Sequence, residues 1–170
     1  MSTTTRSIAL GASVALVIIA AVFGWQYFLQ NNTEQVVDER YSNEEYGFSF
    51  AIPQGFEVWE AENIVVVENE LGDGIQIVIT PIVEDILVLT EERTRADVPD
   101  LVMQDSQAVE IEADRTGLVF TSDNEAFDGA SREVWFVYPG PQGLPQLYQL
   151  STYARLDQLL ESIFISWEFF

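Results

Sequence analysis

The sequence has 170 residues, of which 28 are acidic and only 7 are basic, so its formal net charge is −21. Lysine, histidine and cysteine are absent. This composition excludes a nucleic-acid-binding surface, catalytic sites built on histidine or cysteine, imidazole or thiolate zinc sites, and disulfides. Because 48% of the residues are hydrophobic, the chain can still bury the core of one domain with an added segment.

The first feature in chain order is an uncharged, apolar stretch over residues 8–29. As an α-helix it would be roughly 33 Å long, against about 30 Å for the hydrocarbon core of a bilayer. Trp25, Tyr27 and Phe28 near its end are typical of a membrane interface. We therefore expect a transmembrane signal-anchor. The alternative is a cleaved signal peptide, although residues 22–24 match a small-residue cleavage site poorly.

The charges that flank this stretch predict its orientation. Arg6 precedes it, whereas Glu34, Asp38 and Glu39 follow it before the next basic residue. Positive charge favours the cytoplasmic side of a membrane. Residues 1–7 are therefore expected in the cytoplasm, and the chain beyond the span is expected to be extracytoplasmic in a single-pass protein of the cell membrane.

Residues 30–40 are polar without a clear hydrophobic period, which is typical of a short stalk, so the folded domain is expected over residues 41–170. Within it, large apolar residues alternate with small or polar ones in short runs that end at Gly, Pro or Asp. This pattern predicts β-strands joined by turns. The predicted strands cover residues 46–52, 56–60, 64–68, 75–79, 108–112, 116–121, 133–138 and 146–152.

A first helix is predicted in the middle of the domain, where apolar and charged residues mix at helical spacing. Pro99 fits the first turn of a helix that Asp97 would cap. Such a helix would turn Leu101 and Val102 inward.

A second helix is predicted over residues 155–165, followed by an aromatic tail at residues 167–170 that should pack against the sheet. Four apolar residues recur there at i, i+3, i+4 and i+7: Leu156, Leu159, Leu160 and Ile163. Strands in hairpin order with helices in the middle and at the end predict an α+β fold, a mostly antiparallel sheet flanked by helices and preceded by one transmembrane helix.

The domain also resembles a known family. Tyr-Ser-Asn-Glu-Glu-Tyr-Gly-Phe-Ser-Phe-Ala-Ile-Pro at residues 41–53 is similar to the start of PsbP-like domains, and the runs at 133–138, 147–150 and 164–167 follow in the same order. The resemblance covers residues 41–170 and implies an α/β/α sandwich that docks onto membrane complexes without catalysis. Its photosynthetic members engage partners through Lys and His, which this chain lacks, so the implied role is an extracytoplasmic binding module.

Residues 123–129 form the loop richest in oxygen ligands. Asp123, Glu125 and Asp128 alternate near a glycine, as calcium sites require. The EF-hand pattern fails, because Phe127 occupies a ligand position. The alternatives are weak Ca²⁺ binding and a solvated hairpin loop. No other cofactor is expected.

Residues 139–145 form the one long Pro/Gly loop, between two predicted strands. One interpretation is a rigid hairpin connection. The other is partner recognition through Pro139, Pro141, Leu144 and Pro145.

The acidity and the paired carboxylates leave three hypotheses for function. Residues beyond the span carry all 28 acids and six arginines, a net charge of −22, which suits a basic envelope protein as partner and excludes nucleic acid. The first hypothesis is a membrane-anchored binding or scaffolding module that is not an enzyme. The others are an envelope enzyme with carboxylate acid/base chemistry and a divalent-cation-binding structural domain. Paired carboxylates occur at Glu44/Glu45, Glu91/Glu92 and Glu110/Glu112.

Overall fold

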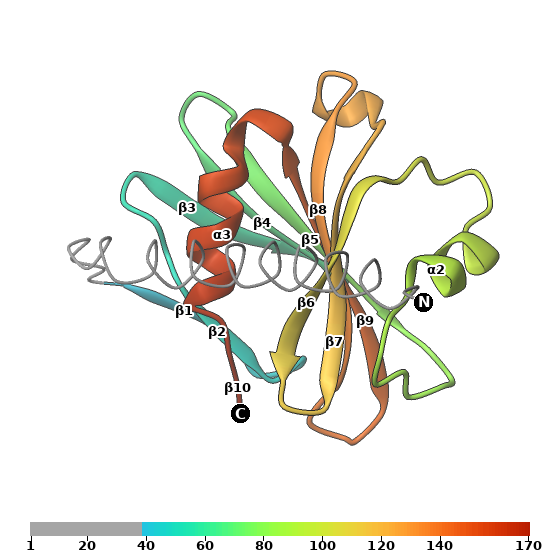
Figure 1. Ribbon diagram of the computed structural model, residues 1–170. Coiled ribbons are helices and arrows are strands. Elements are labelled where there is room, and N and C mark those ends of the chain that lie inside the picture. The colour runs from blue at the N-terminus through green and yellow to red at the C-terminus, as the bar shows by residue number, and fades with distance from the viewer. Residues whose placement is uncertain (1–38) are drawn as a thin grey trace, which may run out of the picture. The chain divides into compact units, whose positions relative to one another are not determined.

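The structure is a computed structural model that describes residues 39–170 (Figure 1). The expected cytoplasmic segment, the span over residues 8–29 and the stalk as far as residue 38 lie outside the described residues. Within residues 39–170, no helix is long and apolar enough to cross a membrane. The anchor and its orientation therefore stay predictions.

The largest element is a seven-stranded sheet in which all neighbouring strands are antiparallel. The strand order is β3-β4-β5-β9-β8-β7-β6, so β5 and β9 pair at the centre although they are distant in sequence. The mostly antiparallel sheet predicted from the alternating pattern is confirmed. Its strands are β3 (Phe56–Ala61), β4 (Ile64–Asn69), β5 (Gly74–Pro81), β6 (Gln104–Glu112), β7 (Arg115–Ser122), β8 (Ser131–Pro139) and β9 (Pro145–Tyr153).

A second, three-stranded sheet has the order β1-β2-β10 and comprises β1 (Arg40–Asn43), β2 (Phe48–Ala51) and β10 (Glu168–Phe169). β1 is absent from the predicted strands, and it begins at Arg40, where the stalk was expected to end. Its sequence carries one large apolar residue, Tyr41, so no alternation marks it. The strand forms because its backbone pairs with β2, with Tyr41 opposite Phe50.

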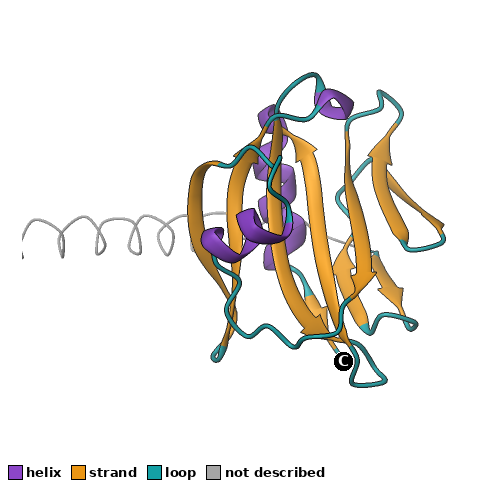
Figure 2. Cartoon of the chain, turned by 90° about the vertical axis from the view of Figure 1, so that its right-hand side faces the viewer, coloured by secondary structure: helices purple, strands orange, loops and turns teal. Residues whose placement is uncertain are grey.

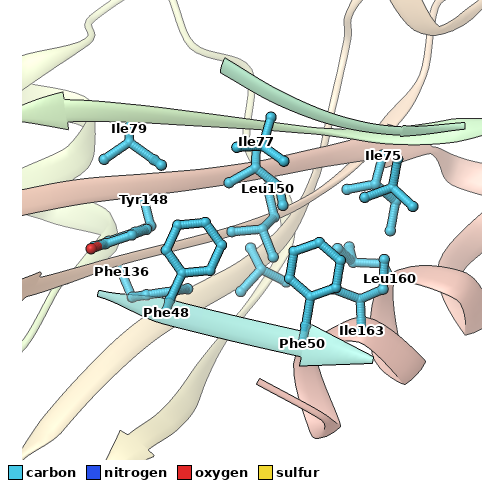
Figure 3. Packing of buried hydrophobic residues seen from close by; sticks show 13 residues of the cluster. Phe48, Phe50, Ile75, Ile77, Ile79, Phe136, Tyr148, Leu150, Leu160 and Ile163 are labelled. Atoms are coloured by element: carbon cyan, nitrogen blue, oxygen red, sulfur yellow. The ribbon is translucent and has the colours of Figure 1, made fainter. Parts of the chain in front are cut away.

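The main core lies between the large sheet on one side and β2 with helix α3 (Asp157–Ile165) on the other (Figure 3). β5 contributes Ile75, Ile77 and Ile79 because every second side chain of a strand faces the same way. The fully or nearly buried members are Phe48, Phe50, Val65, Val67, Ile75, Ile77, Ile79, Val134, Phe136, Tyr148, Leu150, Leu160 and Ile163.

A smaller core covers part of the opposite face of the sheet, beneath helix α2 (Glu91–Asp97). Figures 1 and 2 show the two helices on opposite sides of the sheet. β8 is buried on both faces, with Phe136 in the main core and Trp135 in the smaller one. That double burial explains its nearly continuous apolar sequence. The buried members of the smaller core are Leu89, Met103, Leu118, Phe120 and Trp135.

The prediction for the first helix is wrong in position. α2 begins after Thr90, whose side chain accepts a hydrogen bond from the Arg93 N–H, and Asp97 is its last residue, not its cap. Pro99 follows the helix, because a proline disfavours helical backbone at the preceding residue, Val98, whose φ and ψ are −130° and 78°. Of the two side chains expected to turn inward, Leu101 packs on the smaller core, whereas Val102 is exposed.

The predicted second helix is confirmed, with its first turn tightened into a 3₁₀ helix, η2 (Ala154–Leu156), ahead of α3. Leu160 and Ile163 are its buried residues.

The aromatic tail packs as predicted. Trp167 stacks on Phe48 with ring centroids 4.3 Å apart, and Phe169 stacks on Tyr138 at 3.5 Å. The terminal Phe170 remains exposed.

Candidate binding site

A groove of about 240 Å³ lies between α2 and the sheet. The segment from Ile82 to Leu89, here called the strap, forms one wall. Its ends are fixed by backbone hydrogen bonds, from the Ile82 N–H to the Pro145 carbonyl at 3.0 Å and from the Leu89 N–H to the Thr116 carbonyl at 2.8 Å. β9 and β7, which are both distant in sequence from α2, thus fix the position of the strap beside this helix.

The inner surface of the groove is apolar, and its mouth is mixed. Three sheet residues line it from below, Trp135 and Val137 from β8 and Leu147 from β9. Ile82, Ile86 and Leu89 of the strap add further apolar surface. The mouth is lined by two exposed valines and three charged side chains: Val83, Val98, Glu84, Arg93 and Asp97.

Arg93 spans this mouth. Its guanidinium forms ion pairs with Glu84 of the strap at 2.9 Å and with Asp97 of its own helix at 2.8 Å. The hydrogen bond that Arg93 donates to Glu84, followed by the one it donates to Asp97, raises the pKa of Arg93 above its ordinary value, so the group is a permanent cation. The two carboxylates outnumber it, and the mouth carries one net negative charge.

A buried carboxylate supports the floor of the groove. Glu133 is 3% exposed, and it accepts hydrogen bonds from the Trp135 Nε1–H at 3.0 Å, from the Ser151 hydroxyl at 2.5 Å and from the Ser131 hydroxyl. Burial raises the pKa of the Glu133 carboxyl above its ordinary value, whereas these three donors lower it. By holding the indole N–H, Glu133 sets the orientation of the Trp135 ring that lines the groove.

Glu133 is not among the site residues predicted from the sequence, because there it resembles any acid at the start of a strand. One local signal was available: Ser131, Glu133 and Trp135 alternate and therefore share a face. The remaining contact depends on pairing between β8 and β9, which places Ser151 opposite Glu133.

All the positive charge in the described part of the chain is already neutralised. Of the 28 acids, all except Glu34 and Asp38 lie in residues 39–170, so 26 face six arginines and the net charge is −20. Each of these arginines is in an ion pair with a carboxylate. Arg115 is the most buried, and its hydrogen bonds lower the pKa of Asp85. No arginine in this region is left without a carboxylate partner.

The predicted calcium loop contains a 3₁₀ helix, η1 (Glu125–Phe127), between β7 and β8. Asn124 caps it by accepting a hydrogen bond from the Ala126 N–H, and Asp128 adopts a left-handed backbone with φ of 55°. Phe127 is buried against Tyr153 and anchors the loop. Within residues 39–170 no three acidic side chains gather in a metal-binding arrangement, so Asp123, Glu125 and Asp128 are not brought together. Weak Ca²⁺ binding stays a prediction.

The Pro/Gly loop is a tight connection at the end of the β8–β9 hairpin. Pro139 pairs with Pro145 at its base, and the Gly140 N–H bonds to the Leu144 carbonyl at 2.9 Å. Pro141 packs on Gly47, where a Cβ atom would lie 2.8 Å from the Pro141 Cγ. Leu144 is exposed. The rigid connection is therefore present, and partner recognition by this loop stays a prediction.

None of the paired carboxylates lines the groove. Glu110 and Glu112 are exposed on β6, an edge strand, and Glu44 and Glu45 lie in an exposed turn. Glu91 is in the first turn of α2 and forms an ion pair with Arg95.

Neither a protein-family model nor a curated protein matches the chain. Among solved structures, a 1.50 Å crystal structure of a protein from Bacteroides thetaiotaomicron VPI-5482 is similar, with 12% sequence identity and a TM-score of 0.48. The match covers 79% of this chain and 49% of the other, so the chain spans about half the length of that structure.

Proposed function

We propose that this protein is a single-pass, membrane-anchored binding or scaffolding module. Residues 8–29 anchor it, residues 1–7 are cytoplasmic, and the acidic domain from residue 41 to residue 170 is extracytoplasmic and PsbP-like. The observation that supports the binding role is the apolar groove between α2 and the sheet. Backbone hydrogen bonds at both ends of the strap fix the wall of this groove. Such concave, apolar, pre-formed surfaces are typical of binding sites.

The state of the carboxylates favours binding over acid/base catalysis. A catalytic carboxylate must reach its substrate. The buried carboxyl with a raised pKa, Glu133, has both oxygens occupied by donors from its own domain. It lies behind the Trp135 ring and acts on the groove through that ring.

Site-specific photo-crosslinking in native membranes tests the groove as the binding surface. Val98 and Val102 are both 40% exposed and lie close in sequence, but only Val98 lines the groove. With benzoylphenylalanine at position 98 we expect a discrete adduct, which Leu147→Arg should abolish. With the same group at position 102 we expect no such adduct. Absence of the adduct at position 98, or the same adduct from both positions, would overturn the proposal.

A further inference from the structure

We propose that the groove binds a protein segment that carries one apolar side chain next to a lysine or arginine. This inference rests on the proposed binding function and specifies the partner of the same site. Three features support it: the size of the groove, the charge at its mouth and the lack of a free cation in the described part of the chain.

The size of the groove favours a side chain over a small-molecule ligand. Its volume of about 240 Å³ lies below the roughly 300–1,000 Å³ typical of small-molecule pockets. An apolar side chain inserted between Ile86, Val137 and Leu147 would be surrounded by apolar atoms. Protein interfaces obtain most of their affinity from a few such anchors in desolvated pockets.

The charge at the mouth predicts the residue next to that anchor. Glu84 and Asp97 share Arg93, yet their side chains remain 66% and 57% exposed. Their carboxylates can therefore accept further hydrogen bonds from an incoming cation. A ligand carboxylate, in contrast, could reach only the part of the Arg93 guanidinium that Glu84 and Asp97 leave free, and these two carboxylates would repel it. The mouth thus selects for a basic group and against an acidic one.

The rest of the domain reinforces this preference. The domain has a net charge of −20 over residues 39–170, and every arginine there is in an ion pair. Its electrostatic field therefore repels acidic segments and attracts basic ones. Complementary charge of this kind accelerates association and suppresses wrong partners. Exposed apolar side chains beside the mouth, Val83 and Val98, extend the contact surface around the anchor.

Selection from a phage-displayed heptapeptide library tests the inference. The target is the full-length protein in nanodiscs of neutral phosphatidylcholine, which do not attract basic peptides. We expect enriched peptides to place a Leu, Ile, Val or Phe within one or two residues of a Lys or Arg. A synthetic peptide of the enriched sequence should bind at least about tenfold more tightly than versions with Glu for the basic residue or Ser for the apolar one.

Two matched pairs of variants locate the binding. Val98→Trp, which fills the mouth, should abolish enrichment, whereas Val102→Trp should not. Glu84→Gln should weaken binding of the basic peptide about threefold to tenfold and reduce its preference over the acidic version. Glu92→Gln on the same helix should change neither, because Glu92 does not line the groove.

The outcomes separate this inference from the proposed function. Enrichment of apolar peptides without basic residues, lost in Val98→Trp, would overturn the partner chemistry and leave the groove as the binding site. Enrichment that Val98→Trp does not affect, or no enrichment at all, would overturn both.

Discussion

Replacing Glu133 by glutamine should change how the stability of the domain depends on pH. Burial raises the pKa of the Glu133 carboxyl in the folded protein above its value in the unfolded chain. The folded state therefore binds the proton more tightly. Between these two pKa values the free energy of unfolding falls as the pH rises, because the buried group must lose its proton. Glutamine cannot titrate, so Glu133→Gln should remove this component.

The size of the hydrogen-bond contribution follows from the three donors. Glu133→Leu would leave the Trp135 N–H and the Ser151 hydroxyl without an acceptor. The Ser131 hydroxyl would keep one, because it also donates to the Ser122 carbonyl at 3.5 Å. A buried donor without a partner costs about 1–3 kcal/mol. For two such donors we therefore expect Glu133→Leu to lose about 2–6 kcal/mol at pH 7. Glu133→Gln keeps an acceptor and should remain within about 1 kcal/mol of the unchanged protein.

Urea unfolding of all three proteins at a series of pH values between about 4 and 8 measures both effects. The difference between the free energies of unfolding of the unchanged protein and the glutamine variant cancels the repulsion among the surface acids, which is common to both. If this difference in the free energy of unfolding did not vary with pH, the raised pKa of Glu133 would be refuted. Equal stability of the leucine and glutamine variants would refute the role of Glu133 as an acceptor.

Three further predictions concern the anchor, the core and the acidic surface. Alkaline carbonate extraction should leave the full-length chain in the membrane pellet, and a soluble form that starts near Trp25 would contradict the anchor. Trp167→Ala should destabilise the domain by about 3 kcal/mol in urea unfolding, because the ring stacks on Phe48, whereas Trp59→Ala, at a 46% exposed ring, should cost less than about 1 kcal/mol. The melting temperature should rise between about 10 mM and 500 mM monovalent salt, because salt screens the repulsion among the surface acids, and a salt-independent melting temperature would contradict this repulsion. Calcium at matched ionic strength should raise the melting temperature further, and the double variant Asp123→Asn with Asp128→Asn should abolish that increment.

Several elements could be predicted from local sequence because their signal is complete within a few residues. Ile75, Ile77 and Ile79 alternate with smaller or polar residues, and this period of two identifies β5 and its core face. Leu160 and Ile163 mark the buried face of α3 in the same way. The aromatic tail was also predictable, since such rings are costly to leave in water.

The errors arise where two local signals compete or where no local signal exists. Asp97 before Pro99 matches a helix start, but Thr90 with its acidic first turn matches one as well. In the structure the helix begins after Thr90, and Thr94 is its buried residue. β1 becomes a strand because β2 offers it a partner.

The sequence by itself determined the acidity, the absence of histidine, lysine and cysteine chemistry, the apolar stretch before the domain and the alternating strands. Only the tertiary structure decided the groove. Its walls come from the strap, α2 and two strands about 40 to 60 residues further along the chain, and the ring of Trp135 is oriented by Glu133. Such a site depends on long-range strand pairing, which brings together side chains that no local period relates.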